Sequence, residues 1–477
     1  MKNKYFKKLL LVSILSCTMA YTATSCADNS SVWNAPSSLT GTAQTQRLTR
    51  MDLQEWVQGF QVAFPFYQIE LKSYEDKGPD QSLAVISVAL GNPSGAESTW
   101  GEGMYLESLI KLDIEQGYKL ENGVASIARI NYKTEIQENS TAEFFELQDM
   151  IQNFLDKLQY NSMLIVRPDG ELYAEANSTE AFEWKERHNY ASIPSFTSRA
   201  QTYDNKKLMR FEVLVPLATI GSTRDEGKMV VQNLRVFNAD RPIRDAVYQL
   251  NGDARIDIEK VQIVEEGSQT LVLNDIHYAE KSKVDNAGLL GSKFTVTFSG
   301  EESLLARMND QTPATHRFNF VANGQIKNFH ADSYVNLTRT MFNDPQAWID
   351  DEESMAMVTE IFVHGPQIEL EKVMLIIDGH QGEGSLKVAI PPLTESEKNM
   401  PFVLLALTKL EAAGDMRMPI EWFELVEPDK QVREQMIKSF LEEMDGYIEH
   451  KGNYLVSSFS YKDGNLLVNG KDIGLLN

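Results

Sequence analysis

Hydrophobic and polar residues alternate along much of the chain, and this pattern predicts a protein built mainly from β-strands. Leu83–Leu90 is a short apolar run that ends at Gly91-Asn92-Pro93, and both Leu106–Ile114 and Val124–Ile136 alternate as half-buried strands do. Further strands are predicted at Met163–Val166, Glu171–Ala174, Leu208–Leu217, Met229–Phe237, Ala254–Val264, Thr270–Tyr278, Lys293–Phe298, His316–Val321, Tyr454–Tyr461 and Leu466–Gly470.

Helical periodicity is confined to a few segments between these strands. Residues 51–64 place Leu53, Trp56, Val57 and Phe60 on one face, and the pair Ser140 and Glu143 forms a capping box that opens a second helix. Other helices are predicted at Pro345–Ile361, Pro401–Ala413 and Asp429–Met444. Strands joined by short turns, without a regular βαβ rhythm, indicate an α+β fold: mostly antiparallel, β-rich extended sheets with interspersed helices.

Two segments of the chain resemble each other closely enough to suggest an internal repeat. The segments are Ile256–Gly267 and Ile368–Gly379. In each, hydrophobic and polar residues alternate, a Glu-Lys pair follows, and the alternation then resumes. Each ends in an acidic turn with glycine, which is Glu-Glu-Gly in the first segment and Asp-Gly in the second. The extra residue at the Glu-Lys step shifts the alternation, as a β-bulge does. A duplicated hairpin and a chance similarity between two strands both explain the pattern. A duplication predicts a long sheet with one apolar side.

The first 26 residues have the order of a secretory signal. Lysines at positions 2, 4, 7 and 8 precede an apolar run from Leu9 to Met19, which is short for a membrane span. Ala23-Thr24-Ser25-Cys26 resembles the lipobox of bacterial lipoproteins, in which the cysteine carries the lipid. We therefore predict lipidation at Cys26, although the motif has Ala23 where leucine is usual.

Three alternatives to lipidation at Cys26 remain open. Ile14-Leu15-Ser16-Cys17 is a competing motif, the leader could be cut near Ala23 by an ordinary signal peptidase, and it could stay attached as an anchor. The chain has only two cysteines, Cys17 and Cys26, both in the leader. The exported part consequently has no disulfide framework, and a cysteine kept at the cleavage boundary is what lipidation requires.

Composition divides the rest of the chain into a tether and two halves. Residues 27–49 are rich in Ser, Thr, Asn, Ala and Gln and predict a flexible tether. A β-rich N-terminal half is predicted over 50–245, and a C-terminal half with repeated hairpins over 246–477.

The chain is strongly acidic. Its formal net charge is −23, or about −27 without the four leader lysines. Such a charge disfavours nucleic acid as a partner, and it leaves attachment to a membrane to the lipid anchor.

Several segments of the second half resemble one family. His364–Leu370 followed by Gly382–Val388, the step Met416-Arg417-Met418-Pro419, and the ending Asp463–Gly470 are similar to motifs of the YdgA-like bacterial envelope proteins, known as domain of unknown function 945. Asn251–Ile258 also fits a central strand of that family. The resemblance implies residence in the cell envelope, on the periplasmic side or at the surface. It implies no catalytic residue, because none is established for the family.

Candidate chemistry is sparse in this sequence. None of the seven histidines pairs with another at HxH or HxxxH spacing, so no metal site and no cofactor is predicted. The run Asp350–Glu353 lacks the alternating ligands of an EF-hand loop and is interpreted as a solvated helix face. Asp378–Ser385 lacks the Lys-Ser/Thr end of a phosphate loop and is interpreted as a glycine-rich hairpin turn. There is also no G-x-S-x-G elbow.

Three functions remain compatible with the sequence. The first is a non-enzymatic envelope lipoprotein that binds an envelope protein partner or an apolar ligand such as a lipid. The second is a scaffold that acts by self-association as a homo-oligomer, and the third is a hydrolase whose site is dispersed in the sequence. Eighteen Met and twenty-two Phe residues could line an apolar groove or fill a core. An apolar cavity or groove in the folded protein would favour the first function.

Overall fold

The computed structural model describes most of the chain between Arg47 and Ile473 and divides it into two compact units. Unit 1 comprises residues up to Ile220, Asn233–Ala254 and Leu337–Asp351, and unit 2 comprises the remainder. The residues outside the description are 1–46, 64–66, 92–96, 99–100, 103–104, 120–125, 138–161, 168–170, 179–180, 187, 204–207, 225–226, 243–249, 266–267, 303–314, 344–351, 399, 401, 428, 445 and 474–477.

Unit 1 begins with a capped helix that packs on a sheet. The Thr49 hydroxyl donates to Asp52 Oδ2 at 2.6 Å and accepts from the Asp52 N–H, which fixes the start of helix α2, Arg50–Ala63. Leu53 and Val57 are buried, as the predicted helical face requires. The amide of Gln116 bonds both the N–H and the C=O of Leu48 at 3.0 Å, so Leu48 already belongs to the folded unit.

The sheet of unit 1 is antiparallel throughout its described pairs. Its strands pair in the order β1–β2–β5–β6–β7–β8–β11–β12, with β9 and β10 forming a hairpin. These strands are β1 (Tyr67–Asp76), β2 (Gln81–Gly91), β5 (Tyr105–Gln116), β6 (Ala128–Ile136), β7 (Ser162–Val166), β8 (Leu172–Asn177), β9 (Phe182–Glu186), β10 (Asn189–Ile193), β11 (Thr197–Tyr203) and β12 (Leu208–Ser222), followed by β13 (Lys228–Pro242). The short strands β3 (Glu97–Ser98) and β4 (Gly101–Glu102) pair with each other in a separate sheet. Residues 221–232, at the end of β12 and the start of β13, belong to unit 2.

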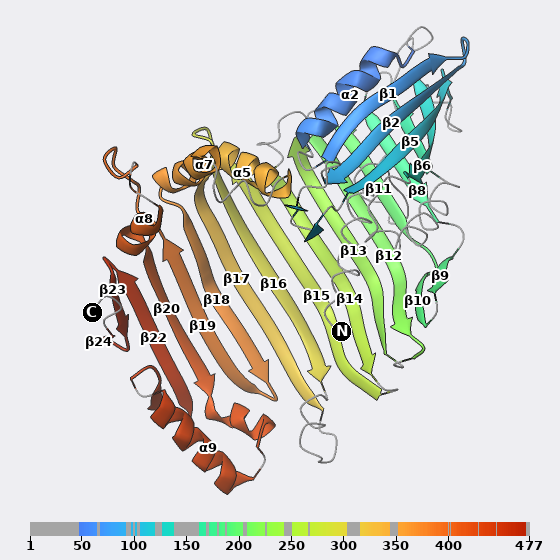
Figure 1. The fold of residues 1–477 in the computed structure, drawn as a ribbon. Coiled ribbons are helices and arrows are strands. Elements are labelled where there is room, and N and C mark those ends of the chain that lie inside the picture. Colours follow the sequence, from blue (N-terminus) through green and yellow to red (C-terminus); the bar gives the residue numbers. More distant parts are fainter. Residues whose placement is uncertain are drawn as a thin grey trace. The chain divides into compact units, whose positions relative to one another are not determined.

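Unit 2 is an antiparallel meander of long strands interrupted by helices (Figure 1). Neighbours pair in chain order from β15 to β20, and β20 then pairs with β22. Its elements are β14 (Gly252–Glu265), β15 (Ser268–Val284), β16 (Leu289–Glu302), β17 (His316–His330), α5 (Ala331–Asn343), α7 (Glu352–Val363), β18 (Gln367–Ile377), β19 (His380–Ala389), α8 (Phe402–Lys409), β20 (Glu411–Pro419), the 3₁₀ helix η3 (Ile420–Leu425), α9 (Lys430–Glu443), β21 (Glu449–Lys451), β22 (Tyr454–Lys462), β23 (Asn465–Val468) and β24 (Lys471–Asp472). The first three residues of β14 and the second half of α5 belong to unit 1.

Because successive strands of the meander reverse direction, its helices gather at the two ends of the strands. Helices α5, α7 and α8 follow β17 and β19 at one end, which we call the α7 end, whereas η3 and α9 follow β20 at the other, the α9 end (Figure 1). Helix α9 begins where predicted, since the Asp429 carboxylate accepts from the N–H groups of Gln431 and Val432. Among the helices that the structure describes, none has the length and apolarity needed to cross a membrane.

The antiparallel, β-rich architecture is confirmed, but strands outweigh helices more than an α+β description suggests. The predicted helix Pro401–Ala413 is too long: α8 ends at Lys409, and Glu411–Pro419 is strand β20. Pairing with β19 and β22 on both sides overrides the helical preference of Glu411-Ala412-Ala413. Helix α5 was not predicted, and the helix predicted from Ser140 lies outside the described residues.

The hairpin prediction for the glycine-rich segment is confirmed. Asp378 and Gly379 have φ angles of 49° and 90° between β18 and β19, as a tight hairpin turn requires. Asp463 and Gly464, with φ angles of 51° and 79°, form the corresponding turn between β22 and β23. Burial raises the pKa of the Asp378 carboxyl, but the Arg317 N–H and the His316 ring outweigh it and hold that pKa below its usual range.

The predicted β-bulge is present in β18. The register of β18 shifts between Leu370 and Val373 against β19, so Glu371 and Lys372 form the bulge. The other copy of the repeat, Ile256–Gly267, lies in β14 up to Glu265. Both segments are therefore strands, and β14 lies beside β15, where Asp257 contacts His277. A bulge in β14, and with it the duplication, stays a prediction.

Aromatic rings lie over glycines on one side of the unit 2 sheet. A Cβ atom built on Gly300, Gly324 or Gly414 would meet the ring of Phe318, Phe294 or Phe459, respectively, at 2.5–2.6 Å. At Gly382 the nearest atoms all belong to the Trp422 ring of η3, the closest at 2.3 Å, and the Trp422 Nε1–H donates to the His380 carbonyl at 3.1 Å. The missing side chains therefore let these rings lie close against the strands.

Alanine at Gly382 is expected to destabilise unit 2 by about 1–3 kcal/mol, because its methyl group would displace the Trp422 ring. Chemical denaturation of the variant measures this. In a Trp422→Ala background the same substitution should be nearly neutral. Gly291→Ala is the matched control, since a Cβ there makes only ordinary contacts, the nearest at 3.8 Å. Equal costs with and without Trp422 would contradict this explanation.

Candidate functional site

The two faces of the unit 2 sheet differ sharply in polarity. Residues paired directly across antiparallel strands share a face, and successive residues of a strand alternate between faces. Phe320 pairs with both Phe298 and Leu375, which places the three on one face, whereas Asn319 and Lys372 lie on the other. The face with Phe320 therefore carries mainly aliphatic and aromatic residues, whereas the other carries most of the polar and charged residues together with Val321, Met374 and Ile376.

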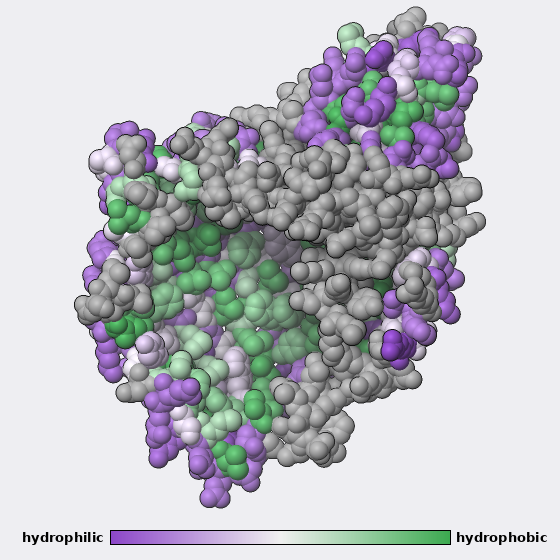
Figure 2. All heavy atoms as spheres, viewed as in Figure 1, coloured by the Kyte–Doolittle hydropathy of each residue, from purple (hydrophilic) through white to green (hydrophobic). Residues whose placement is uncertain are grey.

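The apolar face covers the strands from β16 to β22. Ile368, Met416 and Phe459 are 44%, 43% and 36% exposed on it, and none of its residues on β18 is buried. Figure 2 shows hydrophobic residues gathered in a hollow over β17–β20. The face comprises Phe294, Val296, Phe298, Phe318, Phe320, Ala322, Ile326, Ile368, Leu370, Val373, Leu375, Ile377, Leu386, Val388, Met416, Met418 and Phe459.

The bulge in β18 keeps the glutamates of this strand off the apolar face. Glu369 and Glu371 both contact the side chain of Gln325, on the opposite face, so the two glutamates point away from the apolar face. Without the extra residue, the alternation would turn Val373 and Leu375 to the polar side. Partial burial raises the pKa of Glu369, but the Gln325 amide and Lys327 outweigh it, so the pKa is held below the ordinary value.

Elements at both ends of the strands pack around the apolar face. At the α9 end, Trp422 of η3 packs on Gly382, and Phe440 of α9 contacts Phe423 at 5.8 Å between ring centroids. At the α7 end, Ile390, Leu393 and Leu405 form a small core. Phe362, Val363, Met400 and Leu410 pack against that core. Of the half-exposed side chains, Ile368 lies near the α7 end of β18, whereas Met416 and Phe459 lie farther along the strands between the two ends.

A polar cluster borders the apolar face on β15. The Tyr278 hydroxyl donates to Glu280 Oε2 at 2.6 Å, and the Ser292 hydroxyl donates to Glu280 Oε1 at 2.8 Å. Register places Tyr278, Glu280 and Ser292 on the same side as Phe294 and Val296. An apolar surface with a polar border could orient a molecule that has an apolar body and a polar end.

The apolar face suits a ligand without backbone polar groups. A peptide strand lying on it would bury N–H and C=O groups against side chains that cannot bond them, which is costly. Addition of a strand at the sheet edge next to β22 is disfavoured, because the short strands β21, β23 and β24 already occupy that edge. An acyl chain carries no such groups.

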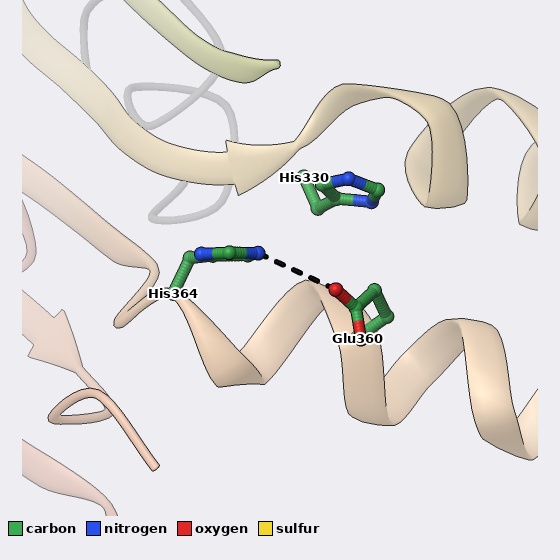
Figure 3. A group of neighbouring side chains, drawn as sticks. All are labelled: His330, Glu360 and His364. Carbon is green, nitrogen blue, oxygen red and sulfur yellow. Dashed lines mark ion pairs between the residues drawn. The ribbon is translucent and has the colours of Figure 1, made fainter. Parts of the chain in front are cut away.

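Three potential metal ligands come together at the α7 end of unit 2 (Figure 3). His330 ends β17, and Glu360 and His364 lie one turn apart on and just after α7. One ligand atom from each lies within 4.8 Å of the others, and His364 Nε2 is 3.4 Å from Glu360 Oε1. Sequence reasoning missed this group because His330 is distant in sequence, although Glu360-x-x-x-His364 at the end of the helix predicted over Pro345–Ile361 was a partial signal.

A serine–histidine contact in the same place does not favour a hydrolase. The Ser333 hydroxyl lies 2.8 Å from His330 Nδ1, three residues away at the start of α5. Ser333 is only 8% exposed, whereas a nucleophile has to reach its substrate. We interpret this contact as a local one that orients the His330 ring.

Two other segments considered in the sequence lie wholly or partly outside the described residues. The predicted lipidation site, Cys26, is outside them. Of the acidic run Asp350–Glu353, only Glu352 and Glu353, which begin α7, are described.

Comparison with known proteins finds one family. A family model described as bacterial protein of unknown function (DUF945) matches residues 176–475, which include all of the apolar face and the His330–Glu360–His364 group. No curated protein and no solved structure matches the chain. The match spans well over half of the chain and agrees with the resemblance of the β18–β19 hairpin and the C-terminal ending. The chain therefore belongs to the DUF945 family of bacterial proteins.

Proposed function

We propose that this protein is an exported, membrane-tethered envelope lipoprotein that binds the acyl chain of a lipid on the apolar face of unit 2. The leader ending at Cys26 supports export and attachment. The observation that carries the binding function is the half-exposed apolar face, since apolar side chains that gather exposed on one face mark an interaction site. Its uncharged, hydrogen-bond-poor character supports an acyl chain over a peptide.

The dimensions of the face fit this ligand. The five strands β16–β20 span about 20 Å at the usual strand spacing, and the 11 residues of β18 extend about 35 Å. The acyl chains of one bilayer leaflet cover about 15 Å, so the face could hold one or two chains lengthwise. Each methylene group removed from water contributes about 0.8 kcal/mol, which makes a half-buried chain of membrane length a ligand of useful affinity.

Fluorescence of cis-parinaric acid, displaced by palmitate, tests the proposal with the full chain carrying Cys26→Ser, so that no detergent is needed. We expect Ile368→Glu and Met416→Glu each to weaken binding by about tenfold or more, since a charge excludes about two methylene groups from contact. Both positions are more than 40% exposed, so folding should tolerate the change.

Val432→Glu on α9 is the matched control, because Val432 is 51% exposed and lies outside the apolar face. It should leave binding unchanged. Absence of probe binding, or equal binding by all three glutamate variants and the parent, would contradict acyl-chain binding. A dimer that dissociates in the Ile368→Glu and Met416→Glu variants, with no probe binding in the parent, would instead identify the face as a self-association surface.

A further inference from the structure

The His330–Glu360–His364 group combines the ligand types that bind transition metal ions. The two imidazole rings face each other with centroids 5.4 Å apart and an interplanar angle of 22°, and the Glu360 carboxylate lies beside them (Figure 3). All three side chains are half-buried. Two imidazole nitrogens and one carboxylate oxygen form a set that suits Zn²⁺ and similar divalent ions.

The backbone around the three ligands is fixed by contacts of its own. The Asn328 side-chain amide donates to the Gly365 carbonyl at 3.2 Å, which ties the end of β17 to the residue after His364. Gly365 has a φ of 73°, and a Cβ there would lie 2.8 Å from the Pro392 ring, so glycine is needed where α7 ends. The Ala331 N–H bonds the Gly288 carbonyl at 2.9 Å next to His330.

We propose that His330, Glu360 and His364 bind a divalent transition metal ion, Zn²⁺ in the first place, that joins α7 to the end of β17. Three protein ligands would leave a fourth tetrahedral position for water. Zinc–ligand bonds of about 2.0–2.2 Å place ligand atoms roughly 3.3 Å apart, which Glu360 and His364 nearly match at 3.4 Å. The His330 ligand atom lies within 4.8 Å of the other two, and its ring, stacked on that of His364, would turn toward the ion on binding.

The surroundings of the group support the assignment. With its proton on Nδ1, His330 donates to the Ser333 hydroxyl and keeps its Nε2 lone pair for a metal ion, which is how outer partners commonly orient histidine ligands. Glu360 and His364 project from one side of α7, since residues four apart on a helix are neighbours. Pairing with Glu395 at 2.8 Å raises the pKa of the Lys398 ammonium group, and the charge of Glu360 raises that pKa only weakly.

This assignment does not depend on the acyl-chain proposal. It concerns a group at the α7 end of the unit, and its consequence is local: an ion would hold α7 against β17 beside the small core around Leu405. Metal binding to the folded chain alone raises the unfolding temperature as the ion concentration rises above its dissociation constant. The ion should be lost at acidic pH, because imidazole must be neutral to bind it.

The test is titration of the metal-free full chain with Zn²⁺ by calorimetry and with Co²⁺ by visible absorption. We expect one ion per chain, a Co²⁺ spectrum of tetrahedral type and a rise in melting temperature on addition of Zn²⁺. Loss of a residue that only hydrogen-bonds a metal ligand weakens metal binding about 10–100-fold. His364→Gln and Glu360→Gln each remove a ligand itself, so each should weaken Zn²⁺ binding by more than this. His330→Gln should do the same.

His450→Gln is the matched control, because His450 is exposed on β21, outside this group. It should bind Zn²⁺ like the parent. Circular dichroism of the metal-free variants should match that of the parent, which separates loss of a ligand from loss of the fold. The proposal is overturned if the parent binds no Zn²⁺, or if the three glutamine variants retain parental affinity and stoichiometry.

Discussion

Deletion of residues 454–470 is expected to abolish cooperative unfolding of unit 2. These residues include β22, which pairs with β20 on one side and with β21 and β23 on the other. They also include Leu455, which is fully buried, and the Asp463-Gly464 turn that sets the register of the last hairpin. The truncated protein would expose the whole edge of β20 and lose a buried part of its core.

A pair of point variants makes this prediction sharper. Leu455→Ala should cost about 2–5 kcal/mol, the range for truncating a buried leucine. Leu467→Ala removes the same atoms from β23 at a site that is 37% exposed, so it should cost clearly less. Urea denaturation followed by circular dichroism measures both, and hydrogen exchange of the β20 amides locates the effect. An unchanged cooperative transition in the truncated protein, or equal costs at Leu455 and Leu467, would contradict a structural role for the hairpin.

Replacement of Cys26 by serine is expected to move the protein from the membrane fraction to the soluble exported fraction. The thiol of Cys26 is the group that lipidation at this position would modify, and serine cannot replace it. Cell fractionation measures the change, and incorporation of labelled palmitate should disappear with it. The expected effect is nearly complete, because the charge of the chain, −23, opposes binding to anionic head groups.

Cys17→Ser is the matched control for that experiment. It removes the only other cysteine of the chain and should leave both fractionation and labelling unchanged if Cys26 is the modified residue. If Cys26→Ser stays in the membrane fraction with its leader attached, an uncleaved anchor holds the protein. If Cys17→Ser alone abolishes labelling, the competing motif at Cys17 is the one that is used.

Much of the strand arrangement follows from local sequence. The alternation in Ile368–Ile377, broken once at Glu371-Lys372, predicts both the strand and its bulge, because each apolar residue must stay on the same side of the sheet. The turns at Asp378-Gly379 and Asp463-Gly464 are equally local, since positive φ angles at two successive residues favour Asp-Gly. Asp429 likewise marks the start of α9 by its own hydrogen bonds.

Other features depend on contacts that local sequence does not contain. Glu411–Pro419 has alanines and a glycine in place of strand-forming residues, and only pairing with β19 and β22 makes it a strand. His330 meets His364 because β17 ends next to α7, a contact between residues far apart in the chain. The sequence also could not predict that Ile368 and Met416 are half-exposed, because a closed core and an open apolar face produce the same alternation of hydrophobic and polar residues.

The central claim is that an acyl chain binds on the apolar face of unit 2, and photo-crosslinking tests it most directly. A palmitate analogue with a diazirine near the chain end would be irradiated with the Cys26→Ser protein, and labelled peptides identified by mass spectrometry. We predict labels on residues of the apolar face, such as Phe320, Leu375 and Leu386, which unlabelled palmitate suppresses. Labels confined to the polar face, labels confined to unit 1, or labelling that palmitate does not reduce would contradict the claim.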